Sequence, residues 1–194
     1  MAGRPKRLLS RHAHQARRIG MDDAQLRLQL ETCHGESYRW ALHCCEWDRV
    51  EAEDVLQVAY LKVLDGRARF DGRSSFSTWL FAVIRRTAAD ERRRRMLRFA
   101  RHAPLRDDAL LASHSAGAAE QSECAERRAR LAAALELLPR RQREVLLLVF
   151  YHERTVEEAA QVIGIGVGSA RTHYARGKQR LRELLNKSEM HHDT

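Results

Sequence analysis

TVEEAAQVIGIGVGSARTHYARGKQRLREL, residues 155–184, is the stretch of sequence that decides the fold. Thr155 can cap a short helix, and Glu158 three residues later completes a capping box. Gly164 suits a left-handed turn, Ile165 plugs that turn, and Val167 leads into a second helix. Two short helices joined by a glycine-containing turn of this length form a helix-turn-helix unit. The stretch therefore predicts a DNA-binding motif.

The second helix of this stretch separates its apolar and polar side chains onto different faces. Small and apolar residues recur at helical spacing, and we assign them to the interior: Ala170, Tyr174, Gly177 and Leu181. Residues near the start of such a helix meet base edges in the major groove, and basic residues further along bind phosphates. We expect DNA contacts from Ser169, Arg171, Thr172, Ala175, Arg176 and Lys178. Arg171 and Arg176 can each bind a guanine or a phosphate, and a basic, solvated face of a plain helical bundle is the alternative interpretation.

Helical periodicity continues on both sides of this motif, and the sequence predicts an all-α protein. We expect two small helical domains joined by a flexible linker. The expected parts are a disordered basic arm at residues 1–20, a helical domain at 21–96, the linker at 97–128, a helix-turn-helix domain at 129–187 and a tail at 188–194. Whether Met1 or Met21 is the true start stays open at this point.

The charge of the chain points to a polyanionic partner. The 194 residues carry a formal net charge of +9 at pH 7. A surplus of arginine without a function is the alternative explanation. No segment approaches the roughly 18 to 20 apolar residues that span a bilayer, and the N-terminus lacks the apolar core of a secretory signal. We expect a cytoplasmic protein that does not insert into a membrane.

The cysteines favour a reduced protein. Cys33, Cys44, Cys45 and Cys124 form no C-x-x-C pair, which is typical of a cytoplasmic chain. Two histidines, at positions 34 and 43, lie close to the first three cysteines in the sequence. A metal site there is an alternative, but the spacing matches no standard zinc pattern. We expect ordinary helix residues at these positions, and no metal or cofactor.

The first domain contains a helix of unusual composition at residues 75–96, SFSTWLFAVIRRTAADERRRRM. Its first half is apolar and aromatic, and its second half is a block of arginines. The first half can pack a helical bundle, whereas the second can hold a nucleic-acid backbone. A preceding helix, EAEDVLQVAYLKVLDG at residues 51–66, carries an apolar stripe at Ala52, Val55, Ala59 and Val63. Gly66 marks the end of that helix.

Both halves of the chain resemble the bacterial extracytoplasmic-function sigma factors. The segments ALELLPRRQREVLLLVF at 134–150 and TVEEAAQVIGIGVGSARTHYARGKQRL at 155–181 resemble region four of that family. The segments EAEDVLQVAYLKVL at 51–64 and FDGRSSFSTWLFAVIRRTAADERRRR at 70–95 resemble region two. The resemblance covers most of residues 21–187. Three positions depart from the family pattern: Val58 replaces an acid, Arg86 an asparagine and Gly177 an alanine.

The resemblance implies an alternative sigma factor that binds core RNA polymerase and directs transcription initiation. The residues of the second helix named above would recognise the −35 promoter element. The −10 element would be captured and melted by Arg67, Arg69, Phe70, Arg73, Ser74, Arg85, Arg86, Arg92 and Arg93. The polymerase would be bound at the clamp helices of its large subunit by Asp54, Gln57 and Leu61, and also at its flap. The other implied partners are promoter DNA and an anti-sigma factor.

Two other functions are weighed against this one. A free-standing regulator would bind duplex DNA as a dimer through the same helix-turn-helix. The helix at residues 75–96, which ends in a block of arginines, does not favour this function. A nucleic-acid enzyme would need a carboxylate cluster or a nucleophile. The acids at positions 46, 48, 51, 53 and 54 form the only cluster, and they lie at a helix start, where the helix dipole explains them more simply. We therefore expect no enzymatic activity.

Overall fold

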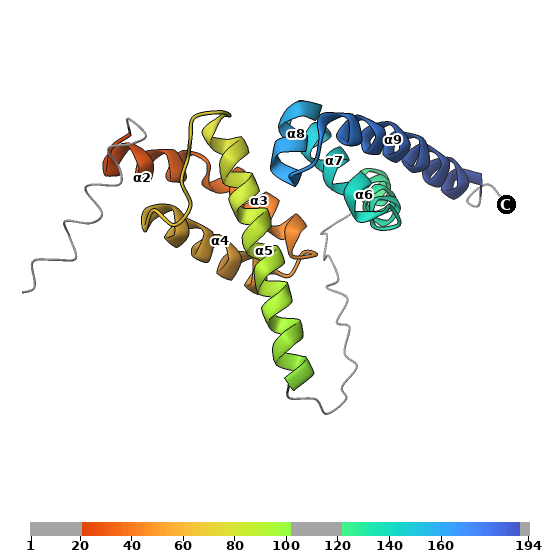
Figure 1. The fold of residues 1–194 in the computed structure, drawn as a ribbon. Helices are drawn as coiled ribbons and strands as arrows, with labels where there is room; N and C mark the ends of the chain where they lie inside the picture. The colour runs from red at the N-terminus through yellow and green to blue at the C-terminus, as the bar shows by residue number, and fades with distance from the viewer. Residues whose placement is uncertain (1–20, 102–121, 191–194) are drawn as a thin grey trace, which may run out of the picture. The chain divides into compact units, whose positions relative to one another are not determined.

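The computed structural model describes residues 21–101 and 122–190, and the predicted arm at residues 1–20 lies outside them. The described residues form eight helices and no strand, which confirms the predicted all-α class. They divide into two compact units, one containing α2 to α5 and the other α6 to α9 (Figure 1). Within the described residues, no helix has both the length and the apolar character that crossing a membrane requires.

The first unit contains α2 (Asp23–Thr32), α3 (His34–Cys44), α4 (Arg49–Leu64) and α5 (Phe76–Arg101). Short polar side chains begin three of these helices by accepting a backbone hydrogen bond. Asp22 accepts from the N–H of Gln25 at 2.7 Å, and Asp48 accepts from that of Glu51 at 3.0 Å. Ser75 fills the same role for α5: its Oγ accepts from the N–H of Thr78 at 3.2 Å.

The core of the first unit lies where α3, α4 and α5 pack together. The predicted stripe of α4 is buried, and the apolar half of α5 covers it with Leu80, Phe81 and Ile84, all fully buried. Trp40 of α3 stacks on Phe81 at 5.7 Å between ring centroids and donates its indole N–H to the carbonyl of Phe81 at 3.0 Å. The first half of α5 is thus fixed by packing, which leaves its second half to project from a rigid platform.

The second unit contains α6 (Ser122–Glu136), α7 (Arg140–Phe150), α8 (Val156–Ile163) and α9 (Val167–Met190). The predicted capping box at the start of α8 is present, with Thr155 and Glu158 each accepting from the other's backbone. Gly164 ends α8 with φ 74° and ψ 43°, the left-handed turn that the sequence predicted. Helices α8 and α9 therefore form the helix-turn-helix.

The inner face of α9 packs against α7. Ala170 and Gly177 are buried, and Tyr174 and Leu181 are half-buried on the same face. Gly177 allows a close approach of the two helices. A Cβ added there would lie 3.2 Å from the Cβ of Gln142 and 3.2 Å from a methyl of Leu146. The assignment of these residues to the interior is confirmed.

Three helices extend beyond the predicted boundaries. Helix α5 continues to Arg101 and α6 begins at Ser122, so both enter the predicted linker at 97–128. Helix α9 runs to Met190, three residues into the predicted tail. These additions lack a clear apolar stripe, which is why the sequence favoured a linker with no more than a helical turn or two. Arginine, alanine and glutamate are nevertheless good helix formers without such a stripe. The remainder of the linker, residues 102–121, lies outside the described residues.

Candidate nucleic-acid interface

The start of α9 presents a polar and basic face to solvent. Six side chains of this face are exposed: Ser169, Arg171, Thr172, Ala175, Arg176 and Lys178. These are the residues that the sequence assigned to DNA. Thr172 donates its hydroxyl to the carbonyl of Gly168 at 3.0 Å, so its methyl group is the part left for an outside contact. The Nζ of Lys178 lies 5.2 Å from the centroid of the Tyr174 ring, so the ring holds the ammonium group by a cation–π contact.

Arg171 is connected to the other helix of the motif. Its Nη2 donates to Oε1 of Glu157, in the first turn of α8, at 2.8 Å. The hydrogen bond from Arg171 is the main cause that holds the pKa of Glu157 below its usual value. Both side chains are at least half exposed, so the pair contributes little to stability. Its effect is to fix where the guanidinium lies.

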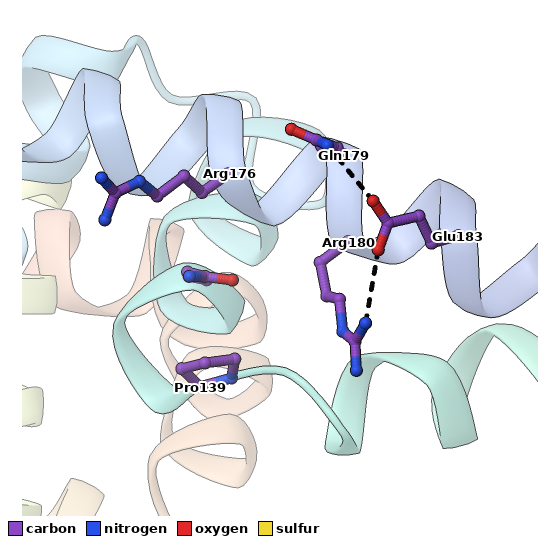
Figure 2. A pocket seen from close by; sticks show the side chains of 6 residues that line it. Pro139, Arg176, Gln179, Arg180 and Glu183 are labelled. Carbon is purple, nitrogen blue, oxygen red and sulfur yellow. Dashed lines mark hydrogen bonds and ion pairs between the residues drawn. The ribbon is translucent and has the colours of Figure 1, made fainter.

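A shallow groove of about 330 Å³ lies between α7 and α9. It is lined by Pro139, Gln142, Arg176, Gln179, Arg180 and Glu183 (Figure 2). Glu183 accepts from Gln179 at 3.2 Å and from Arg180 at 3.3 Å. The side chain of Arg176 points away from these contacts (Figure 2). Arg176 is thus available to a ligand outside the chain.

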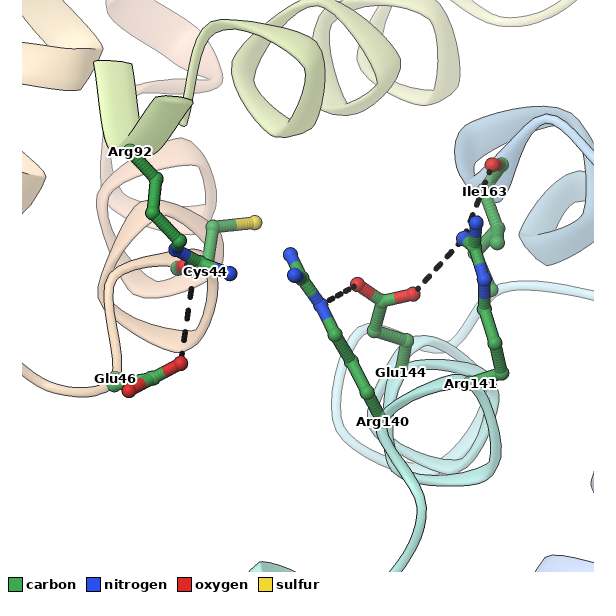
Figure 3. Close-up of polar contacts among 7 residues, drawn as sticks. All are labelled: Cys44, Glu46, Arg92, Arg140, Arg141, Glu144 and Ile163. Carbon is green, nitrogen blue, oxygen red and sulfur yellow. Dashed lines mark hydrogen bonds and ion pairs between the residues drawn. The ribbon is translucent and has the colours of Figure 1, made fainter. Parts of the chain in front are cut away.

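A carboxylate at the start of α7 supports the turn of the motif. Glu144 is buried and accepts from Arg140 at 3.0 Å and from Arg141 at 3.3 Å (Figure 3). Arg141 also donates, at 3.5 Å, to the carbonyl of Ile163, the last residue of α8. The carboxylate therefore holds a cation at the carboxyl end of α8, where the helix dipole favours it. The sequence did not predict this arrangement, because a glutamate that follows three arginines and precedes an apolar run resembles an ordinary exposed residue.

The loop before α5 contains an aromatic ring that packs against the start of α5, and arginines paired with neighbouring acids. Phe70 lies 5.7 Å from the ring of Phe76 and 5.3 Å from that of Trp79, and it is half-buried. Two predicted −10 contacts have acidic neighbours in sequence: Arg67 pairs with Asp65 at 2.8 Å, and Arg73 with Asp71 at 3.4 Å. Arg69 is exposed, and Ser74, half-buried, donates to the carbonyl of Ser75. The structure thus packs the one aromatic ring of the loop against two rings of α5 and places several arginines in the same loop.

The arginines of α5 divide into two sets. Arg92 donates to the carbonyl of Cys44 at 2.7 Å and lies 3.9 Å from Glu46, which ties α5 to the end of α3 (Figure 3). Arg95 pairs with Glu51 at 2.7 Å and ties α5 to α4. Arg86 and Arg93 are exposed, and no described residue forms an ion pair with either. Arg85 is half-buried. Sequence alone did not separate these two sets.

The outer face of α4 is exposed and mixed in character. The three residues that the resemblance assigned to polymerase, Asp54, Gln57 and Leu61, are all exposed. Val50 and Leu64 are exposed large apolar side chains of the same helix. The face therefore combines a carboxylate, an amide and aliphatic side chains, which suits a protein partner better than a nucleic acid.

The residues considered for a metal do not gather in the described part of the chain. No group of three or more histidine, cysteine, aspartate or glutamate side chains there could hold a metal ion. Cys44 and Cys45 are buried at the end of α3, and Cys33 is half-buried before it. Burial raises the pKa of Cys45 to about 12, so its thiol stays protonated.

The sequence matches two family models in the order in which the two units occur. Residues 31–98 match Sigma-70 region 2, and residues 128–181 match Sigma-70, region 4. The chain is 33% identical to the RNA polymerase sigma factor CarQ of Myxococcus xanthus, over 72% of this chain and 77% of that protein. It is 29% identical to the ECF RNA polymerase sigma factor SigX of Bacillus subtilis, over 81% of this chain and 82% of that protein.

Two solved structures have the same fold. One is the sigma factor RpoE in complex with the anti-sigma factor NepR from Bartonella quintana, with a TM-score of 0.61 and 22% identity over 82% of this chain and 96% of that one. The other is CnrH in complex with the cytosolic domain of CnrY, with a TM-score of 0.59 and 21% identity over 91% of this chain and 97% of that one.

Proposed function

The chain belongs to the extracytoplasmic-function sigma factors, and from this premise we propose how its two units divide the work of starting transcription. As a member of this family it is an alternative sigma factor that directs transcription initiation, and the dimeric regulator is not favoured. We propose that the second unit recognises the −35 element and that the first unit melts the −10 element and binds polymerase. One observation supports this division above all: each unit has its own exposed basic surface on a packed helical frame.

For the −35 element, the proposed surface is the exposed start of α9. An α-helix with this side-chain distribution enters the major groove and places its first turns against base edges. The turn at Gly164 fixes the angle between α8 and α9, and the carboxylate of Glu144 supports that turn through Arg141. Arg171 and Arg176 supply the guanidinium groups for guanine or phosphate.

For the −10 element, the proposed surface consists of the loop before α5 and the exposed arginines of α5. A base that leaves the duplex needs a stacking surface and hydrogen-bond donors, and Phe70, Arg69 and Ser74 can provide them. Exposed cations such as Arg86 and Arg93 can hold the phosphates of the displaced strand. The buried half of α5 keeps this surface in place while the duplex opens.

The proposed partners follow from the same surfaces and relatives. Asp54, Gln57 and Leu61 would contact the clamp helices of the polymerase large subunit, and the second unit would contact the flap. An anti-sigma partner is proposed because RpoE and CnrH, which share the fold, are described in complexes with NepR and with the cytosolic domain of CnrY. Because bacterial transcription takes place in the cytoplasm, we propose that compartment for the chain. Catalysis of RNA synthesis would stay with the polymerase.

The test is run-off transcription by core polymerase mixed with the full chain on a library of randomised promoters. We expect transcripts to start downstream of a shared two-part motif. Replacing Arg171 and Arg176 with alanine should abolish selection of the upstream part while polymerase binding in a pulldown is retained. Failure of the chain to bind core polymerase, together with a shift of duplex DNA by the chain alone, would contradict the proposal and favour a free-standing regulator.

A further inference from the structure

The contact between Glu157 and Arg171 joins the two helices of the DNA-binding motif at its exposed surface. The residues are 14 positions apart in sequence, on α8 and α9, and Nη2 to Oε1 is 2.8 Å. Glu157 lies in the first turn of α8, where the helix dipole favours a carboxylate. Among the described residues, Glu157 is the only side chain that pairs with Arg171.

The pairing with Glu157 distinguishes Arg171 from the other two cations of α9 that we assign to DNA. Arg176 and Lys178 are exposed, and neither forms an ion pair with a described residue. A carboxylate beside a guanidinium repels a phosphate, whereas it leaves the remaining N–H groups able to donate to O6 and N7 of guanine. The same carboxylate fixes one rotamer, so less side-chain entropy is lost when the arginine binds a base. Arg171 is thereby suited to a base, and Arg176 to a phosphate.

We propose that Glu157 is a specificity-determining residue that holds Arg171 for a guanine in the upstream promoter element. This inference rests on the proposed function, because it assumes that the start of α9 enters the major groove of that element. Glu157 acts through Arg171 and does not itself need to touch DNA. Its loss affects base preference at one position and leaves contacts elsewhere in the element unchanged.

The experiment uses the full chain with core polymerase on promoters whose upstream element is randomised, read out by sequencing of run-off transcripts. In the Glu157→Ala variant, preference for guanine at the position read by Arg171 should fall about three- to fivefold, because Arg171 stays in place and loses only the positioning that an exposed ion pair supplies. Glu157→Gln retains the acceptor oxygen without the charge and should give a smaller fall. Preferences at the other positions should stay within twofold in both variants.

The matched control is Glu183→Ala. Glu183 also pairs with an arginine of α9, Arg180 at 3.3 Å, but it lies further from the start of the helix. Its removal changes the net charge by the same amount, so both alanine variants should bind non-specific DNA more tightly. Only Glu157→Ala should lose the guanine preference. An equal loss in both variants would mean a general effect of charge and would overturn the proposal.

A double variant separates positioning from other effects. In an Arg171→Ala background, Glu157→Ala should cause no further change in base preference, because the residue it positions is gone. A guanine preference retained in Glu157→Ala and Glu157→Gln, or a loss that persists in the Arg171→Ala background, would overturn the inference alone. If Arg171→Ala itself leaves every base preference unchanged, the proposed role of α9 fails instead.

Discussion

Gly177 lies where α7 and α9 approach each other closely, at a position where the sequence resemblance leads one to expect alanine. The residue is buried, and a methyl group in place of its hydrogen would be crowded, because its Cβ would lie 3.2 Å from side-chain carbons of Gln142 and Leu146. Glycine within a helix costs about 1 kcal/mol relative to alanine. The packing of α7 on α9 that glycine permits therefore offsets its low helix propensity. Substitutions at this position can separate the contribution of packing from that of propensity.

We predict that Gly177→Ala changes the free energy of unfolding by less than about 1 kcal/mol, since the gain in propensity opposes the tight contact. Gly177→Val should lower it by about 2 to 3 kcal/mol, because its extra methyl groups cannot be placed without displacing Leu146. Ala175→Val is the matched control, as it adds the same branched side chain at an exposed position of the same helix. Thermal unfolding followed by circular dichroism measures all three. Equal effects of the two valine variants would contradict the close approach.

Burial of Cys45 makes the stability of the first unit depend on pH in the alkaline range. Its thiol has a pKa of about 12 in the folded chain, mainly because of burial, against 9.0 for an unperturbed thiol. Between these values the unfolded thiol loses its proton and the folded one retains it. The free energy of unfolding should therefore fall as pH rises from about 9 towards 12, by about 1.4 kcal/mol per pH unit at most.

The measurement is urea denaturation followed by tryptophan fluorescence, which reports on the first unit because Trp40, Trp47 and Trp79 all lie there. Stability at pH 10 should be lower than at pH 8 in the parent chain, and the difference should shrink in Cys45→Ala. Iodoacetamide should modify Cys45 only after unfolding. Rapid modification of Cys45 in the native chain would show that the thiol is not buried.

At the scale of the element, α5 combines two uses of arginine in one helix. Arg92 and Arg95 bind the ends of α3 and α4, whereas Arg86 and Arg93 remain exposed. The contact of Arg92 supports a strained corner, since Glu46 and Trp47, which follow α3, have φ of 54° and 70°. The arginine block is thus partly structural, although the sequence shows only a run of like charges.

We predict that Arg92→Gln and Arg93→Gln, which change the charge equally, have different effects. Arg92→Gln should lower the free energy of unfolding of the first unit by about 1 to 2 kcal/mol, through loss of a hydrogen bond from a charged donor. Arg93→Gln should leave stability within about 0.5 kcal/mol. It should instead weaken promoter binding by the polymerase complex and reduce the salt dependence by about one ion. Urea denaturation and promoter binding at several salt concentrations measure both variants. A reversed pattern would show that Arg93 is the structural residue.

The elements that the sequence predicted well are those with a local physical signal. The capping box at Thr155 and Glu158, the left-handed turn at Gly164 and the apolar stripe of α4 each need only neighbouring residues, and each is confirmed. Contacts between distant residues carried no such signal. The bond from Arg92 to Cys44, the support of Ile163 by Arg141 and the pairing of Arg171 with Glu157 depend on how the helices pack. Helix ends without an apolar stripe were also missed.

In the whole molecule, we propose that the two units carry out different steps of initiation. The matches to region 2 and region 4 fall on the first and second unit respectively, in the order that the sequence resemblance implied. The assignment of particular residues to the −10 element, the −35 element and polymerase remains a proposal. It predicts that changes on the surface of the first unit abolish melting but leave recognition intact, whereas changes on the surface of the second unit abolish recognition and, with it, melting.

The most direct test probes both steps on one promoter obtained from the randomised library, with core polymerase and the full chain. Nuclease protection reports binding at the upstream element, and permanganate reactivity of thymines reports melting downstream. We predict that Arg69→Ala combined with Arg93→Ala retains upstream protection and loses melting, whereas Arg171→Ala combined with Arg176→Ala loses both. Loss of upstream protection in the first variant, or normal protection and melting in the second, would contradict the division of labour between the two units.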